Sequence, residues 1–188
     1  SREEPRTGTG GTLAWAVDVD NPATGEHFTL TLKEITLTAT DGSTSTRPCA
    51  MGLSGNYPKA LDGLARILSL DMRVIDPAWI GMKLRKLLNY SEPLGDFMAF
   101  VPGKKRQQNW PSTVAYLAQL IIHRYAMLGV LDEHGFPLRD MGVLDTPGVS
   151  EKTSLMAGKP CPECGNPTVI HKDGCDFCTA CGYVGQCG

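Results

Sequence analysis

The sequence lacks several features that would place it in a large class of proteins. It has no apolar run near the roughly 18 residues that a membrane span needs, so we expect no membrane-spanning segment. Its first residues, Ser1-Arg-Glu-Glu-Pro5, do not form the apolar segment of a signal peptide, from which we expect a cytoplasmic location. The formal net charge is only −2, so no general positive charge attracts the chain to nucleic acid.

Familiar catalytic motifs are also missing. The sequence has no Gly-rich phosphate loop in the right context, no Ser/His/Asp set and no His-Glu-x-x-His motif. The basic run Lys104-Lys105-Arg106 is a candidate phosphate contact, but three bases flanked by neutral residues are more typical of a solvated loop.

Cysteine, by contrast, is concentrated at one end of the chain. Cys49 stands alone in a polar stretch, and the other six of the seven cysteines lie between Cys161 and Cys187. In a chain without a secretory signal, closely spaced cysteines indicate metal ligands or catalytic thiols rather than structural disulfides. We expect Cys49 to be a plain, unreactive thiol.

Two Cys-x-x-Cys-Gly units, 161–165 and 178–182, have the form of paired zinc knuckles. In each unit two thiolates can reach one metal from a tight turn, and the glycine can adopt a positive φ that directs backbone N–H groups at the sulfurs. A short hairpin at about 168–173 would return the chain between them. We therefore predict a zinc ribbon with four ligands: Cys161, Cys164, Cys178 and Cys181.

This assignment leaves Cys175 and Cys187 over, and two spare thiols on a metal-anchored tail suggest redox chemistry. A rival assignment uses Cys175 and Cys178 as the second metal pair and leaves Cys181 and Cys187 to exchange electrons. Its weakness is that the residue after Cys178 is not glycine. His171 is a further candidate ligand, but the four cysteines are better placed.

The rest of the chain predicts an α+β fold. Alternating apolar residues indicate an antiparallel hairpin, and apolar residues three and four apart indicate three helices. The expected strands are 12–19 and 28–35, and the expected helices are 57–73, 77–88 and 111–129. We interpret 41–48 as a soft stretch and 91–109 as a loop. The expected parts are a loose N-terminal segment (1–11), an α+β docking domain with a hairpin or small sheet packed on three helices (12–130), a flexible linker (131–158) and a zinc ribbon (159–188).

The order of hairpin, helices and cysteine tail resembles the C-terminal region of adenosylcobalamin (vitamin B12)-dependent, class II ribonucleotide reductases. It looks most like the form in which this region is a separate short polypeptide. Three stretches carry the likeness: the hairpin 13–32, the segment Leu64-Ala-Arg-Ile-Leu-Ser69 in the helix pair, and the tail 161–188. The tail departs from the family pattern by having five residues, where four are common, between its last knuckle cysteine and the terminal one.

The resemblance implies an accessory subunit or fragment of such a reductase. Its tail would shuttle electrons by thiol–disulfide exchange, from thioredoxin or a similar dithiol reductant to the active-site disulfide of a separate catalytic chain. Cys175 and Cys187 would be the redox pair, and adenosylcobalamin would belong to the catalytic chain. The radical-bearing barrel of the family does not fit into 188 residues, so this chain would be part of an oxidoreductase and not complete alone.

The competing hypothesis is a zinc-ribbon adaptor that binds a protein without redox chemistry. An adaptor for nucleic acid would need a basic ribbon. Residues 159–188 instead hold two lysines against three acidic residues, a net charge of −1, which argues against direct nucleic-acid binding.

Overall fold

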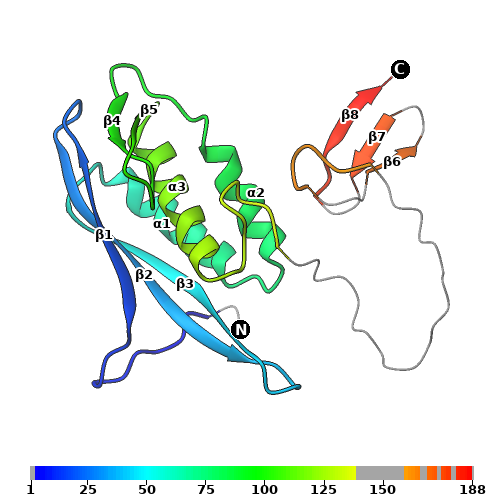
Figure 1. Cartoon of the computed structure of the whole chain (residues 1–188), viewed down its shortest axis with the longest axis horizontal. Coiled ribbons are helices and arrows are strands. Elements are labelled where there is room, and N and C mark those ends of the chain that lie inside the picture. The colour runs from blue at the N-terminus through cyan, green and yellow to red at the C-terminus, as the bar shows by residue number, and fades with distance from the viewer. Residues whose placement is uncertain (1–2, 139–158, 166–168, 173–174, 179–180, 188) are drawn as a thin grey trace. The chain divides into compact units, whose positions relative to one another are not determined.

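The computed structural model describes residues 3–138, 159–165, 169–172, 175–178 and 181–187. The chain divides into two compact units, Ser1–Leu138 and Arg139–Gly188 (Figure 1). Within the described ranges the first unit has three helices, a three-stranded sheet and a two-stranded sheet, and the second has a small three-stranded sheet; all the sheets are antiparallel. The predicted α+β class is confirmed.

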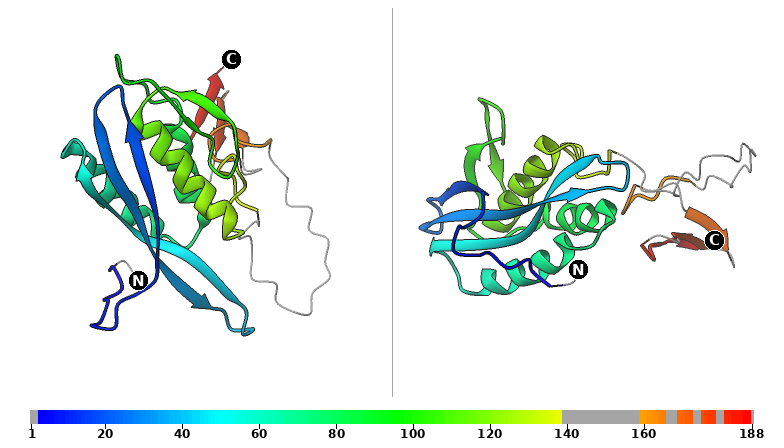
Figure 2. Two further views of the ribbon diagram at one scale, coloured as in Figure 1. Left: turned by 60° about the vertical axis from the view of Figure 1, so that its left-hand side comes forward. Right: turned by 90° about the horizontal axis from the view of Figure 1, so that it is seen from below.

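The larger sheet consists of β1 (Ala14–Asn21), β2 (Glu26–Thr38) and β3 (Thr44–Asn56), in that order. β1 and β2 form the predicted hairpin. Along β2 buried residues alternate with more exposed ones, so that Phe28, Leu30 and Leu32 lie on one face and join the core. Residues 36–45, at the far end of the β2–β3 hairpin, are exposed and project beyond the helices (Figure 2).

Strand β3 includes residues 44–48 of the soft stretch that was expected at 41–48. It contains proline and glycine, which strands disfavour. A register shift between Lys33 and Glu34 of β2 places Cys49 in a bulge, because Ala50 pairs with Lys33 and Pro48 pairs with Glu34. Cys49 is therefore buried in a strand and not in a polar loop. Burial raises the pKa of its thiol, which agrees with the prediction of an unreactive residue.

The three predicted helices are present as α1 (Ala60–Met72), α2 (Pro77–Leu87) and α3 (Thr113–Met127). Asp76 caps α2 by accepting a hydrogen bond from the Ala78 N–H at 2.9 Å, and proline follows the cap. Ser112 caps α3 in the same way through the Ala115 N–H at 3.1 Å. These caps explain why the second helix begins where its sequence pattern predicts, whereas α3 begins slightly later.

Polar contacts join the helices to the sheet around the apolar core. The Ser69 hydroxyl of α1 accepts a hydrogen bond from the Met51 N–H of β3 at 2.9 Å. The Arg124 guanidinium of α3 donates to both carboxylate oxygens of Glu34 on β2, at 2.6 and 3.1 Å. The sheet and the helices therefore form one packed unit.

A second hairpin, β4 (Phe97–Phe100) and β5 (Gln107–Trp110), lies within the segment that was expected to be a loop. The basic run 104–106 is exposed between these strands, as expected for a solvated loop. Trp110 is buried, and its indole N–H donates to the Ala99 carbonyl at 3.1 Å. Trp110 is therefore part of the hydrophobic core next to α3.

Residues 131–138, which the sequence placed in the linker, are an ordered part of the first unit. Leu131 is fully buried. The Asp132 carboxylate accepts hydrogen bonds from the N–H groups of His134 and Phe136, both at 2.9 Å. The expected linker therefore begins too early, and the rest of it, 139–158, lies outside the described residues.

Candidate metal centre

The second unit is built on the predicted knuckles and three short strands: β6 (Val169–Lys172), β7 (Cys175–Cys178) and β8 (Val184–Cys187). They pair in this order, with β7 in the centre. The first knuckle precedes β6, and the second begins at the end of β7. The expected chain return between the knuckles is thus the β6–β7 pair.

Both knuckles make the same turn. Gly165 has a φ of 74° and Gly182 has a φ of 75°, the left-handed conformation that glycine adopts without steric cost. The Gly165 N–H donates to the Cys161 carbonyl at 2.8 Å, and the Gly182 N–H donates to the Cys178 carbonyl at 2.9 Å. The positive φ predicted for the two glycines is confirmed, although their N–H groups donate to carbonyl oxygens and not to the sulfurs.

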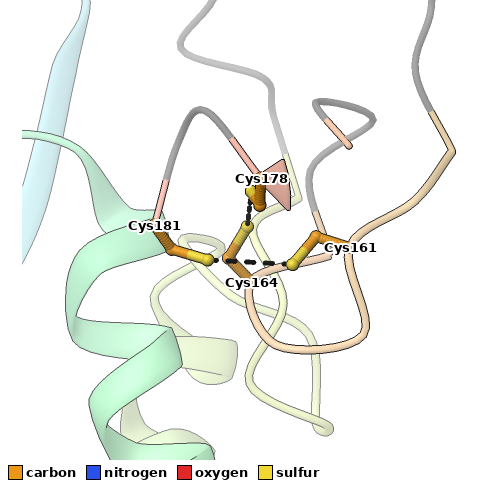
Figure 3. Close-up of side chains that lie close together, drawn as sticks. All are labelled: Cys161, Cys164, Cys178 and Cys181. Atoms are coloured by element: carbon orange, nitrogen blue, oxygen red, sulfur yellow. Dashed lines mark hydrogen bonds between the residues drawn. The ribbon is translucent and has the colours of Figure 1, made fainter. Parts of the chain in front are cut away.

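These turns bring Cys161, Cys164, Cys178 and Cys181 together (Figure 3), with all four Sγ atoms within 4.8 Å of one another. Each short contact joins one knuckle to the other: Cys161 to Cys181 at 3.7 Å and Cys164 to Cys178 at 3.6 Å. A tetrahedral zinc with Zn–S bonds of about 2.3 Å requires S–S separations of about 3.8 Å. The four cysteines, here called the quartet, are close enough to hold a metal ion, and their spacing is compatible with zinc.

Three sulfurs of the quartet belong to buried residues, and only Cys181 is partly exposed. The Glu163 N–H donates to the Cys161 Sγ at 3.4 Å, so the backbone supports a sulfur that would carry negative charge. In this structure burial raises the pKa of the Cys181 thiol. Because a metal ligand must be deprotonated, metal binding would release the proton of this thiol. Four cysteine ligands leave no open position, which is typical of a structural site.

Cys175 does not belong to the quartet, which favours the first assignment of ligands over its rival. It stands at the start of β7 and is disulfide-bonded. The backbone register of β7 and β8 pairs it with Cys187, the other residue of the predicted redox pair. Cα atoms of directly paired antiparallel residues are roughly 4.5 to 5.5 Å apart, which is within the range that a disulfide spans. The Cys187 side chain lies outside the described part of the structure.

His171 is not brought to the quartet. Its Nδ1 lies 2.9 Å from Asp176 Oδ1 on the neighbouring strand, and the imidazole is exposed. This position agrees with the preference for the four cysteines over His171 as metal ligands.

The ribbon also exposes three apolar side chains that the sequence interpretation did not single out: Ile170, Phe177 and Val184. Each lies on a different strand. In the sequence, the available signal was that these residues are apolar and lie among the cysteines and polar residues of the tail. Only the pairing of the strands reveals that they are neighbours.

Comparisons of this chain with protein-family models, with curated proteins and with solved structures gave no match. Across the described ranges, none of the helices combines the length and apolar character needed to cross a membrane. The chemistry of the quartet and of Cys175 therefore provides the main evidence for a function.

Proposed function

We propose that this chain is the accessory C-terminal subunit or fragment of a vitamin B12-dependent ribonucleotide reductase. Its ribbon holds zinc in the quartet and carries electrons, by thiol–disulfide exchange, from thioredoxin or a similar dithiol to the active-site disulfide of a separate catalytic chain. The observation that carries the proposal is that Cys175 is disulfide-bonded outside the quartet. The resemblance of the tail to this family supplies the reaction.

The proposed chemistry needs two kinds of sulfur in one small unit. Zinc bound in the quartet would restrict the motion of β7, because the ligand Cys178 ends that strand. Cys175 lies outside the quartet, and the backbone of Cys187 pairs with it across β7 and β8, next to a register shift between Cys175 and Phe177. Metal binding thus keeps the redox pair opposed even after its disulfide has been reduced.

In the working cycle a reductant thiolate attacks one sulfur of the Cys175–Cys187 disulfide. A mixed disulfide forms, and the other sulfur leaves as a thiolate. A second reductant thiolate then attacks the mixed disulfide and frees the ribbon as a dithiol, which has gained two electrons. The same two steps, with the ribbon now as the donor, reduce the disulfide of the catalytic chain.

The first unit is the docking domain of the proposal, and the nucleotide and adenosylcobalamin belong to the catalytic chain. No step assigned to the present chain passes through that cofactor. A cytoplasmic location suits this scheme, because thiols of the cytosol are kept reduced and available for exchange.

The proposal is tested by counting zinc and thiols in the same sample. The full chain should bind one zinc, and reduction should expose two further thiols that oxidation removes again. Cys175→Ser should keep the zinc and lose the exchange, while Cys49→Ala, which alters a buried cysteine of the first unit, should keep both. Loss of zinc in Cys175→Ser would instead support the rival assignment of ligands.

A second test joins the chain to a catalytic partner and thioredoxin. Multiple turnovers should require the full chain and should fall to about one equivalent with Cys175→Ser. If turnover stays at one equivalent with and without the full chain, the shuttle role is wrong.

The alternative function is a zinc-ribbon adaptor that binds a protein without redox chemistry. The exposed apolar residues of the ribbon favour it, because such groups commonly mark protein contacts. A chain that binds zinc but shows no reversible disulfide in the thiol count would be an adaptor.

A further inference from the structure

An apolar row crosses one face of the ribbon sheet. Ile170 on β6 pairs with Phe177 on β7, and Phe177 pairs with Val184 on β8. Directly opposed residues of antiparallel strands have their side chains on the same face of the sheet. The three side chains are 41%, 38% and 59% exposed, respectively, so this apolar row is open to contact.

Cys175 lies on the same face as the apolar row. It precedes Phe177 by two residues on β7, and side chains two apart along a strand point to the same side. Cys178, which is fully buried in the quartet, points to the other side. The central strand therefore separates the two functions of the ribbon: the metal ligand lies on one face, and the disulfide with the apolar row lies on the other.

We propose that the apolar row is the surface on which the ribbon receives the protein dithiol that reduces its disulfide. This inference rests on the redox function proposed above. A thiolate that attacks Cys175 must come within bonding distance of its sulfur, so the protein that carries the thiolate covers the neighbours of Cys175 on that face. Those neighbours include Phe177 and the two residues paired across from it.

The redox state of Cys175 identifies the occupant. The residue is disulfide-bonded here, and the partner that acts on the oxidised ribbon is the reductant. The disulfide of a catalytic chain, by contrast, reacts with the reduced ribbon. The apolar row is exposed in this oxidised state, which is the state that the reductant meets.

The exchange on this surface balances as follows. The first thiolate of the reductant forms a bond to one sulfur of the ribbon disulfide, and the bond between the two ribbon sulfurs breaks. Its second thiol loses a proton and attacks the mixed disulfide, which leaves the reductant oxidised and the ribbon with two more electrons. The two ribbon thiolates take up protons from water.

The test compares a protein reductant with a small one, using the full zinc-loaded chain. Phe177→Ser and, independently, Ile170→Ser remove the apolar row from two different strands. Ile67→Ser, at a residue of α1 that is 60% exposed, is the matched control in the first unit. The rate of disulfide reduction is measured by stopped flow with thioredoxin and with dithiothreitol, and zinc content verifies that each variant keeps its ribbon.

With thioredoxin we expect the second-order rate constant to fall about ten-fold in both row variants, while the control keeps its rate. A ten-fold fall corresponds to about 1.4 kcal/mol. With dithiothreitol, which needs no surface, all four chains should react alike.

Unchanged thioredoxin rates in zinc-loaded row variants overturn the docking surface and leave the shuttle function standing. A parallel fall with dithiothreitol also overturns it, because the substitutions would then act on the disulfide itself. If the substitutions slow only the transfer from the reduced ribbon to the catalytic chain, the catalytic chain is the occupant of the row. If they only abolish a dimer, a second copy of this chain is the occupant. Either result overturns the proposed docking of the reductant. If the wild-type chain has no disulfide that either reductant can reduce, the proposed function itself fails.

Discussion

The glycine at the end of the second knuckle allows a strict test of the metal centre. Gly182 has a φ of 75°, and a Cβ built there would meet nothing within 4 Å. Alanine at this position would therefore cause no clash, and its only cost is the left-handed conformation, about 1–2 kcal/mol for a residue with a Cβ. Because a metal site of this kind folds as it binds, the cost should appear in zinc affinity. We expect Gly182→Ala to bind zinc roughly 5- to 30-fold more weakly.

The assay is competition for zinc with a chromogenic chelator. All variants are measured at the same pH, so that protons compete equally with zinc for the ligand thiols. Gly182→Asn is the matched control, because asparagine tolerates positive φ better than alanine does. It should lose less affinity than alanine although its side chain is larger. If alanine binds zinc as tightly as glycine, the turn does not hold the ligands as described. If asparagine is the worse of the two, side-chain bulk rather than backbone conformation sets the cost.

Three further predictions concern the first unit and are measured on the full chain. Gly55→Ala should lower the free energy of unfolding in urea by more than about 2 kcal/mol, because φ is 125° and a Cβ would lie 2.7 Å from the His27 carbonyl oxygen; a loss below about 0.5 kcal/mol would contradict this close approach. Glu34→Gln should cost about 1–3 kcal/mol in the same assay, because Arg124 loses a charged, two-point partner; Glu34→Gln with the wild-type urea midpoint would show that the pair is dispensable. The hydrogen bond to Asp20, and then its charge, raises the pKa of His27 above its ordinary value, so its stabilising contribution is complete below the unfolded-state pKa and disappears as pH rises through the folded-state pKa. NMR titration should show this pKa falling back in Asp20→Asn, and an unaltered titration would exclude the pair.

The helices and the first hairpin were predictable because their signals are local. A stripe of apolar residues with a three- and four-residue period specifies a helix wherever it packs, and Asp76 followed by Pro77 marks a helix start independently of the rest of the fold. Strand β3 could not be found in this way. Its proline and its bulge at Cys49 break the two-residue period, and it is held by pairing with β2 over most of its length. The four-residue strands β4 and β5 carry too few residues to show any period.

The metal quartet was predictable for a different reason. Two cysteines separated by two residues and followed by glycine specify a tight turn. Five consecutive residues therefore define each half of the site. No comparable short sequence motif marks the apolar row beside Cys175. Its three members belong to different strands, and a shift of one residue in the register of any strand would move its member to the other face.

The register of the ribbon is therefore the property on which both proposals depend, and the quartet gives a physical reason why it should be stable. Cys178 ends β7, and Cys181 lies shortly before β8, so a metal bound to both would fix where the two strands meet. Strands of four residues have few hydrogen bonds with which to resist slippage. A metal that fixes the turn between β7 and β8 would favour the nearer pair, Phe177 with Val184, whereas the pairing of Cys175 with Cys187 lies beyond a register shift between Cys175 and Phe177. In the proposed shuttle, zinc would thus transfer no electrons and would help to hold Cys175 on the same face as the apolar row.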